Sequence, residues 1–100
     1  DLEQDMTIDY GQQMVLGDTV SKVVIDALGG KESNAYKEIG KKVFAECNRD
    51  LKHYFNVNAR NNVPKKKFDE AMQYVKSWQP CTNTRIMIQE CNAQLSMECD

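Results

Sequence analysis

The sequence predicts an all-α fold, a single domain over residues 1–100 with four to five helices stapled by two disulfides. Apolar residues recur at helical spacing through most of the chain. One hundred residues, of which 41% are apolar and 28% charged, are enough for one small core. Four cysteines in so short a chain would supply two cross-links, which a thin core needs.

The first predicted helix covers residues 16–28. Its apolar stripe consists of Leu16, Val20, Val23, Val24, Ala27 and Leu28. Asp18 can cap its start, and the glycine pair at 29 and 30 can end it in the left-handed conformation. Upstream residues spaced by four belong either to a preceding helix or to the first turns of the same one: Met6, Tyr10 and Met14.

The second predicted helix opens at Ser33, a favourable N-cap residue, and extends to Phe55. Its apolar face consists of Tyr36, Ile39, Val43, Cys47, Leu51, Tyr54 and Phe55. Cys47 therefore faces inward. The Asn-rich residues 56–64 that follow have no period, so we interpret them as a loop.

The third predicted helix begins near Phe68, because the three lysines before it are unfavourable at a helix N-terminus. It stops before Pro80, since proline cannot continue the hydrogen-bond ladder. Its apolar face consists of Phe68, Ala71, Met72, Val75 and Trp78. Residues 82–99 form the last predicted helix, with a short strand over residues 85–89 as the alternative.

The cysteines and the start of the chain indicate secretion. The cysteine count is even, and no C-x-x-C pair suggests zinc or thioredoxin chemistry. The sequence starts at Asp1 and has no apolar stretch of about 18 residues, so we interpret it as a mature chain from which a leader was removed. We expect an extracellular protein without membrane insertion. The alternative is a cytosolic domain with four buried thiols.

Two disulfides would restrict the last helix, because every full pairing joins two of Cys81, Cys91 and Cys99. On one straight helix Cys91 and Cys99 lie about 12 Å apart and Cys81 and Cys99 about 27 Å, whereas bridged Cα atoms lie within about 7 Å. Residues 81–99 are then not a single helix. In the easiest solution the chain after Pro80 folds back, so that Cys81 can reach Cys99 and Cys91 can reach Cys47.

The cysteine spacing of the second half of the chain resembles that of insect odorant- and pheromone-binding proteins. Cys47 on a long helix, Cys81, and the run Q-E-C-N-A-Q-L-S-M-E-C with Cys91 and Cys99 correspond to the second, fourth, fifth and sixth cysteines of that family. The resemblance implies the pairs Cys47–Cys91 and Cys81–Cys99. Leu51 stands where the third cysteine of the family falls, and the first has no counterpart.

The candidate ligand-binding residues are aromatic and methionine side chains on the helix faces. They either fill the core or line a cavity for an apolar ligand, to which flexible methionine adapts. The set consists of Tyr36, Phe44, Tyr54, Phe55, Phe68, Met72 and Trp78.

No catalytic constellation is apparent. His53 is the single histidine, and it lies about 240° around its helix from Cys47, so the two do not form a nucleophile and base pair. A His-rich metal site is impossible with one histidine. We expect no enzyme activity, no catalytic residue, no metal and no cofactor.

Charge indicates no nucleic-acid partner at the level of the whole chain. The net charge is −2, which gives no overall basic field. The one basic cluster, Lys65 to Lys67 with Arg60 nearby, could contact an anionic partner, but we interpret it as a solvated loop and helix start.

We therefore expect a secreted, non-enzymatic helical binding protein that encloses a small hydrophobic ligand. The alternative is a secreted helical signalling or effector protein that acts on a protein receptor through an exposed helix face. Whether Trp78 lines a void or packs against side chains separates the two. The apolar faces are also compatible with a homodimer.

Overall fold

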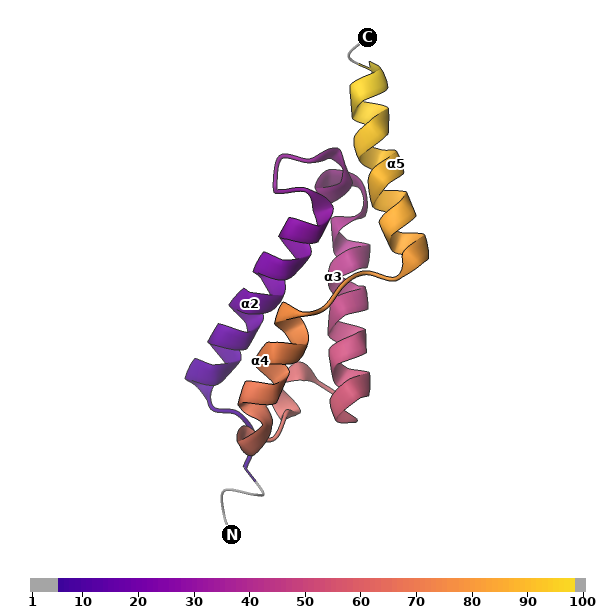
Figure 1. Ribbon diagram of the computed structural model, residues 1–100. Coiled ribbons are helices and arrows are strands. Elements are labelled where there is room, and N and C mark those ends of the chain that lie inside the picture. The colour runs from indigo at the N-terminus through magenta and orange to yellow at the C-terminus, as the bar shows by residue number, and fades with distance from the viewer. Residues whose placement is uncertain (1–5, 99–100) are drawn as a thin grey trace.

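The computed structural model describes the backbone of residues 6–98 and the side chains of residues 6–93. Over this range the chain is all-helical, as the sequence predicts, with four α-helices and no β-strand. The helices are α2 (Tyr10–Leu28), α3 (Asn34–Phe55), α4 (Phe68–Lys76) and α5 (Thr82–Glu98), with short 3₁₀ turns η1 (Arg60–Asn62) and η2 (Lys65–Lys67) (Figure 1).

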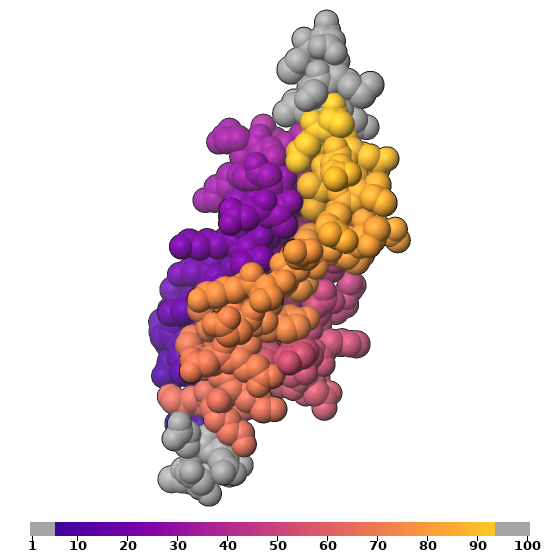
Figure 2. Space-filling view, viewed as in Figure 1, coloured from indigo at the N-terminus to yellow at the C-terminus, as the bar shows by residue number. Residues whose placement is uncertain are grey.

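The helices form an elongated molecule with extents of 62 × 23 × 18 Å. Helices α2 and α3 run antiparallel, α4 packs on one end of this pair, and α5 packs on α3 toward the other end (Figure 1). In the view of Figure 2, α2, α4 and α5 cover most of the surface and α3 emerges at the right edge below α5. Exposed residues, among them Lys41, Ala45 and Arg49, mark the outer side of α3.

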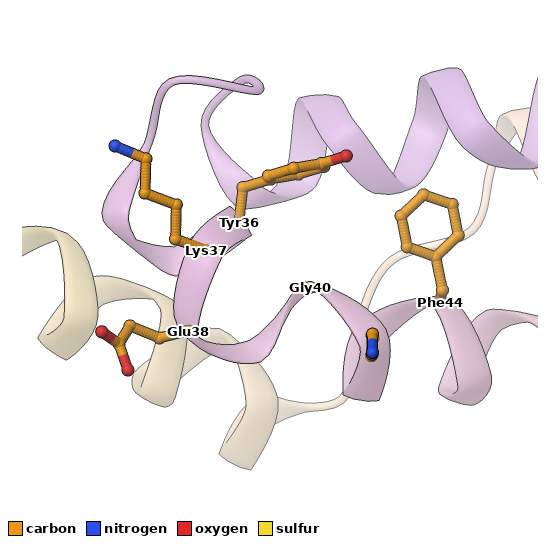
Figure 3. A pocket seen from close by; sticks show the side chains of 6 residues that line it. Tyr36, Lys37, Glu38, Gly40 and Phe44 are labelled. Carbon is orange, nitrogen blue, oxygen red and sulfur yellow. The ribbon is translucent and has the colours of Figure 1, made fainter.

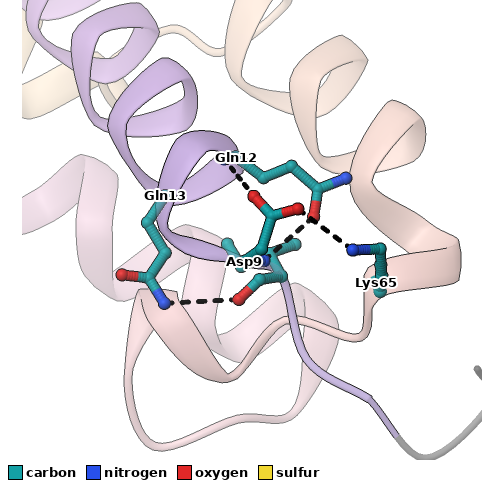
Figure 4. Close-up of polar contacts among 5 residues, drawn as sticks. Asp9, Gln12, Gln13 and Lys65 are labelled. Carbon is teal, nitrogen blue, oxygen red and sulfur yellow. Dashed lines mark hydrogen bonds and ion pairs between the residues drawn. The ribbon is translucent and has the colours of Figure 1, made fainter.

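Helix α2 begins at Tyr10 and not after Asp18, which is a correction to the expected start. The carboxylate of Asp9 accepts a hydrogen bond from the backbone N–H of Gln12 at 2.8 Å, and the side chain of Gln12 accepts one from the N–H of Asp9 at 3.0 Å (Figure 4). This reciprocal capping box stabilises the earlier start. Tyr10 and Met14 therefore belong to the first turns of the same helix.

The caps predicted for the next elements are confirmed. Gly29 ends α2 in the left-handed conformation with φ of 100°, and the hydroxyl of Ser33 accepts from the N–H of Tyr36 at 3.1 Å. Asn56 ends α3 with φ of 55°. Helix α4 begins at Phe68, after the lysine turn η2, as expected.

The loop between α3 and α4 is tied to the segment before α2. The N–H of Ile8 donates to the carbonyl of Val63 at 3.0 Å, and the N–H of Lys65 donates to the carbonyl of Met6 at 2.8 Å. Ile8 and Val63 are both buried. The loop is therefore held in place by backbone pairing and by two apolar side chains.

Helix α5 is one continuous helix that is anchored near both of its ends by polar contacts. Glu46 of α3 is buried, and its carboxylate accepts hydrogen bonds from the N–H of Cys81 and the hydroxyl of Thr84 at the start of α5. The side chain of Asn92 donates to the carbonyl of Leu28 at 3.1 Å and accepts from the N–H of Ala35 at 2.9 Å. The strand alternative for residues 85–89 is wrong, because these residues are helical.

The expected disulfide staples are not found. Cys47, Cys81 and Cys91 are free thiols, and Cys99 lies outside the described residues. The carbonyl of Cys91 accepts from Asn34 in the first turn of α3, whereas Cys47 lies thirteen positions further along that helix, about 20 Å away. Because α5 is also continuous, the folded-back chain that the pairing required is absent between Thr82 and Glu98.

The core lies between α2, α3 and α4. Its fully buried side chains include Leu16, Val20, Val24, Leu28, Val43, Cys47, Leu51 and Val75. Trp78, just after α4, is 8% exposed, and its indole N–H donates to the carboxylate of Asp50 at 2.8 Å. No helix within residues 6–98 is both long and apolar enough to cross a membrane.

Candidate functional site

The seven candidate ligand-binding residues lie in three different places. Tyr36 and Phe44 line an open pocket of about 440 Å³, and in Figure 3 both rings reach from α3 toward the side on which α2 runs. Tyr54 and Trp78 line a second pocket of about 440 Å³ between α3 and α4. The remaining three are partly buried against the core: Phe55, Phe68 and Met72.

The pocket at Tyr54 is aromatic and bordered by carboxylates. The ring of Tyr54 stacks on that of Tyr74 with centroids 4.5 Å apart. A hydrogen bond to the carboxylate of Glu70 raises the pKa of Tyr54 above its ordinary value, and the negative charge of Glu70 adds to this effect. The carboxylate of Asp50 accepts a hydrogen bond from Trp78, which also lines this pocket. These acids make the pocket unsuitable for an anion.

The outer side of α3 is basic, and at its edge Lys42 contacts α5, where its ammonium lies 3.7 Å from the sulfur of Met87. Lys41, Lys42, Arg49 and Lys52 recur at helical spacing on this side, and we name them the basic face. Three of them are exposed and Lys52 is half-buried. His53 and the half-buried Asn48 share the same side of the helix. The basic face is therefore a continuous cationic stripe along the second half of α3.

The two carboxylates on the same stretch of α3 are turned away from the basic face. Glu46 is hydrogen-bonded to the start of α5, and Asp50 to the indole of Trp78. Both are engaged on the sides of α3 that pack against other elements. Between Lys41 and His53 the chain therefore has no exposed carboxylate to neutralise the stripe.

Charge is strongly segregated along the chain. Residues 37–67 contain nine Lys and Arg and three Asp and Glu, a net charge of +6. The other residues contain four Lys and Arg and twelve Asp and Glu, a net charge of −8. The whole-chain value of −2 is thus the difference between two large and opposite local charges.

Almost none of the cations has an acidic partner. Among the described side chains the one ion pair joins Lys65 to Asp9, at 3.0 Å (Figure 4). The hydrogen bond from the N–H of Gln12, and then this contact with Lys65, lower the pKa of Asp9 below its ordinary value of 3.8. The members of the basic face have no carboxylate within 4 Å in the described part of the chain.

A polar pocket of about 340 Å³ adjoins the basic face. We name it the Arg60 pocket; its lining residues are Asn48, Lys52, Asn58, Ala59, Arg60 and Asn61. The guanidinium of Arg60 donates through Nη1 to the amide oxygen of Asn48 at 2.9 Å. No carboxylate lines this pocket. The loop after α3 thus extends the cationic surface into a concave, donor-rich site.

Comparison with known families decides the class of the chain. The family model of the ORF6C domain matches residues 1–88. The chain belongs to the ORF6C domain family. This is a domain of the phage or mobile-element type. Comparison with curated proteins and with solved structures gives no match.

The family overturns three expectations. The resemblance to odorant- and pheromone-binding proteins is wrong, because the ORF6C model covers most of the chain and no such family matches. The secreted carrier of a small hydrophobic ligand is wrong, since ORF6C is a phage-type domain. The secreted signalling or effector protein is wrong for the same reason.

Sequence reasoning singled out only part of the basic surface of this ORF6C domain. It noted Arg60 and the lysines of η2 but left out the lysines and the arginine of α3. These residues stand at positions 41, 42, 49 and 52, a spacing that places them on one side of a helix. That spacing was the signal from which the basic face could have been predicted. In the described residues, no group of three or more His, Cys, Asp or Glu is placed to hold a metal ion.

Proposed function

We propose that this ORF6C domain is a non-enzymatic module that binds the phosphate backbone of a nucleic-acid duplex through the basic face of α3. The observation that carries the proposal is the row of cations on the outer side of α3, where Glu38, one turn before Lys41, is the exposed carboxylate. Lysine and arginine contacts to phosphates supply most of the affinity of sequence-independent binding. Such contacts also position a protein on the duplex.

The dimensions of the basic face suit a phosphate backbone. Lys41 and Lys52 are eleven positions apart on α3, which corresponds to about 16 Å. Along one strand of a duplex, phosphates recur about every 3.4 Å of helix axis. The face therefore spans several consecutive phosphates.

The position of the aromatic residues favours a duplex over a single strand. Proteins that hold single strands stack the bases on exposed aromatic side chains. Tyr54, the exposed aromatic residue of α3, lies nine positions from Ala45 at the centre of the basic side, so it points about 180° away. It is also stacked on Tyr74. The basic face itself offers cations and the side-chain amide of Asn48, which suit the phosphate oxygens of a nucleic acid.

The net charge of −2 led us to expect no nucleic-acid partner, but that argument averages over the molecule. Electrostatic interactions between exposed charges are screened beyond about 8 Å at physiological ionic strength. The two shorter extents of the molecule are 23 and 18 Å. Acidic side chains on the far side therefore contribute little to the potential outside α3.

The proposal assigns no catalytic step to the domain. His53 is the single imidazole of the chain and is exposed on the basic side of α3. Cys47 is the nucleophilic side chain nearest to His53 in the sequence. Burial raises the pKa of its thiol to about 12, so the thiol stays protonated. Neither residue is placed to activate the other.

The test compares two variants that each lose three positive charges, one on the basic face and one elsewhere on the surface. We expect Lys41→Gln, Arg49→Gln and Lys52→Gln together to weaken binding of a fluorescent 20-base-pair DNA duplex by at least about tenfold, measured by anisotropy at about 0.1 M salt. The control combines Lys22→Gln, Lys31→Gln and Lys76→Gln, which remove the same charge from exposed positions elsewhere. We expect this control to bind nearly as the unmodified domain does.

Two outcomes would contradict the proposal. One is an equal loss in the face variant and the control, which would show a dependence on net charge alone. The other is that the domain binds anionic phospholipid vesicles but does not bind the duplex. A matching RNA duplex, measured in parallel, decides which sugar backbone is preferred.

A further inference from the structure

The Arg60 pocket is built from α3 and the loop that joins α3 to α4, and α2 packs against its arginine. The guanidinium of Arg60 lies between Asn48 of α3, whose amide oxygen it bonds at 2.9 Å, and Gly17 of α2. A Cβ at position 17 would lie 3.1 Å from Nη2 of Arg60. The absence of a side chain on Gly17 thus makes room for the guanidinium.

Internal pairing does not account for the placement of Arg60. Its Nε is buried and has no hydrogen-bond partner in the described part of the chain. No carboxylate of the described residues lies within 4 Å of the guanidinium. Buried donors without a partner are rare in proteins, and each calls for an explanation. An anion in the pocket that Arg60 lines would offset the charge of this guanidinium, although its oxygens do not reach the buried Nε.

The other lining side chains favour the same ligand chemistry. Lys52 supplies a second cation, and Asn58 and Asn61 supply amide N–H groups. Asn48 uses its oxygen for Arg60, which leaves its amide N–H groups for a ligand. Three amides and two cations without an acid suit a ligand that is anionic and only accepts hydrogen bonds.

We propose that the Arg60 pocket is the anchoring subsite for one phosphodiester group of the bound duplex, with Arg60 and Lys52 as its direct contacts. This inference rests on the proposed function, because Lys52 belongs to both the pocket and the basic face. Arginine forms two parallel hydrogen bonds to a phosphate, whereas lysine acts as a point charge. The pocket thereby fixes the position of the duplex, and the exposed members of the basic face add affinity.

The first test keeps the charge and changes the shape of the cation. We expect Arg60→Lys to weaken binding of the 20-base-pair DNA duplex by about fivefold to tenfold. The slope of affinity against salt should stay unchanged, because the number of cations is the same. Arg85→Lys is the matched control at an exposed position of α5, outside the basic face and the pocket, and we expect it to bind as the unmodified domain does.

The second test displaces the guanidinium without altering it. Gly17→Ala should shift Arg60 by a few tenths of an ångström and weaken duplex binding by about twofold to threefold. The melting temperature should not fall, because alanine favours a helix over glycine. Gly11→Ala is the matched control, since its Cβ would meet only the side chain of Asp9, at an ordinary contact distance of 3.5 Å.

The outcomes separate this inference from the proposed function. If Arg60→Lys and Gly17→Ala, both folded by circular dichroism, bind as the unmodified domain does while the triple variant of the basic face does not, the subsite is wrong and the proposed function stands. Equal losses in Arg60→Lys and Arg85→Lys also overturn it. If the unmodified domain binds no duplex, the proposed function itself fails.

A small-anion site is a different outcome with its own readout. Inorganic phosphate is titrated while the Nε–H resonance of Arg60 is followed by NMR. We expect that resonance to shift with the duplex at micromolar concentration and to need millimolar phosphate for the same change. A site that binds free phosphate as tightly as the duplex would overturn the assignment to a phosphodiester.

Discussion

The cysteines show how neighbouring groups decide the chemistry of a side chain. Cys47 lies in the core, and its burial, followed by the charge of Asp50, raises the pKa of its thiol to about 12. Cys81 is exposed at the start of α5, where contact with the side chain and then the backbone N–H of Thr84 lowers its pKa below the ordinary value of 9.0. The two thiols should therefore react very differently.

We expect iodoacetamide to modify Cys81 rapidly in the folded protein and Cys47 only after unfolding, because the thiolate is the reacting form and Cys47 is neither ionised nor exposed. Timed labelling followed by peptide mass mapping measures both rates. Equal rates would contradict the two environments. A folded chain in which Cys47 and Cys91 are joined by a disulfide would contradict the structure more broadly.

Glu46 shows that a buried charge in this fold has a structural purpose. Its carboxylate accepts from the N–H of Cys81 at 2.8 Å and from the hydroxyl of Thr84. A carboxylate at a helix start also interacts favourably with the helix dipole. The residue therefore fixes the start of α5 on α3, and it is removed from the basic face by the same contacts.

At the level of the helix, the start of α2 depends on the ionised form of Asp9. The N–H of Gln12 and then Lys65 lower the pKa of Asp9 in the folded state (Figure 4). A carboxyl whose pKa is lower in the folded than in the unfolded state stabilises the fold above its unfolded pKa. This contribution is lost as the pH falls through the folded value, which lies below 3.8.

We expect the melting temperature of the unmodified domain to fall between about pH 5 and pH 2, and Asp9→Asn to reduce this fall. Asparagine retains N-cap ability but cannot titrate or pair with Lys65. Thermal unfolding followed by circular dichroism at several pH values measures the difference. Asp18→Asn, at an exposed position in the middle of α2, is the control. If the melting temperature of Asp9→Asn fell with pH as much as that of the unmodified domain, the ionised Asp9 cap would not be the cause of the acid destabilisation.

Most helices could be predicted because their signals are local. Ser33 as a cap and the lysines before Phe68 each mark the start of a helix through local chemistry. The end of α4 was predicted less well, because the helix stops at Lys76 and leaves Trp78 outside it, before Pro80 takes effect.

The cap of α2 was assigned to Asp18, with an earlier start left open, because two aspartates both precede apolar residues. The deciding signal is Gln12, three residues after Asp9, which completes a capping box. Ser21 stands at the equivalent place after Asp18 and does not supply the matching side chain.

The cysteine pairing and the candidate site depend on distances that sequence spacing does not contain. Four cysteines are equally compatible with bridges and with free thiols until the positions of α3 and α5 are known. The pocket at Arg60 likewise requires Gly17, Asn48 and Arg60, which are far apart in the chain, to meet. The basic face was recoverable from the sequence, because its residues share one helix.

On the scale of the whole molecule, the arrangement of charge matters more than its sum. Residues 37–67 have a net charge of +6 and the rest of the chain −8. The fold places four of these cations on the outer side of α3, and it engages Glu46 and Asp50 in contacts elsewhere. A chain with a net negative charge can in this way present a local cationic surface.

The salt dependence of duplex binding tests this account most directly. Affinity of the unmodified domain for a 20-base-pair DNA duplex is measured between about 50 and 200 mM salt. The four residues of the basic face and Arg60 should release about five counterions, so that the logarithm of affinity falls with the logarithm of salt concentration with a slope of about −4 to −5. A slope near zero, or no binding at the lowest salt concentration, would contradict the account.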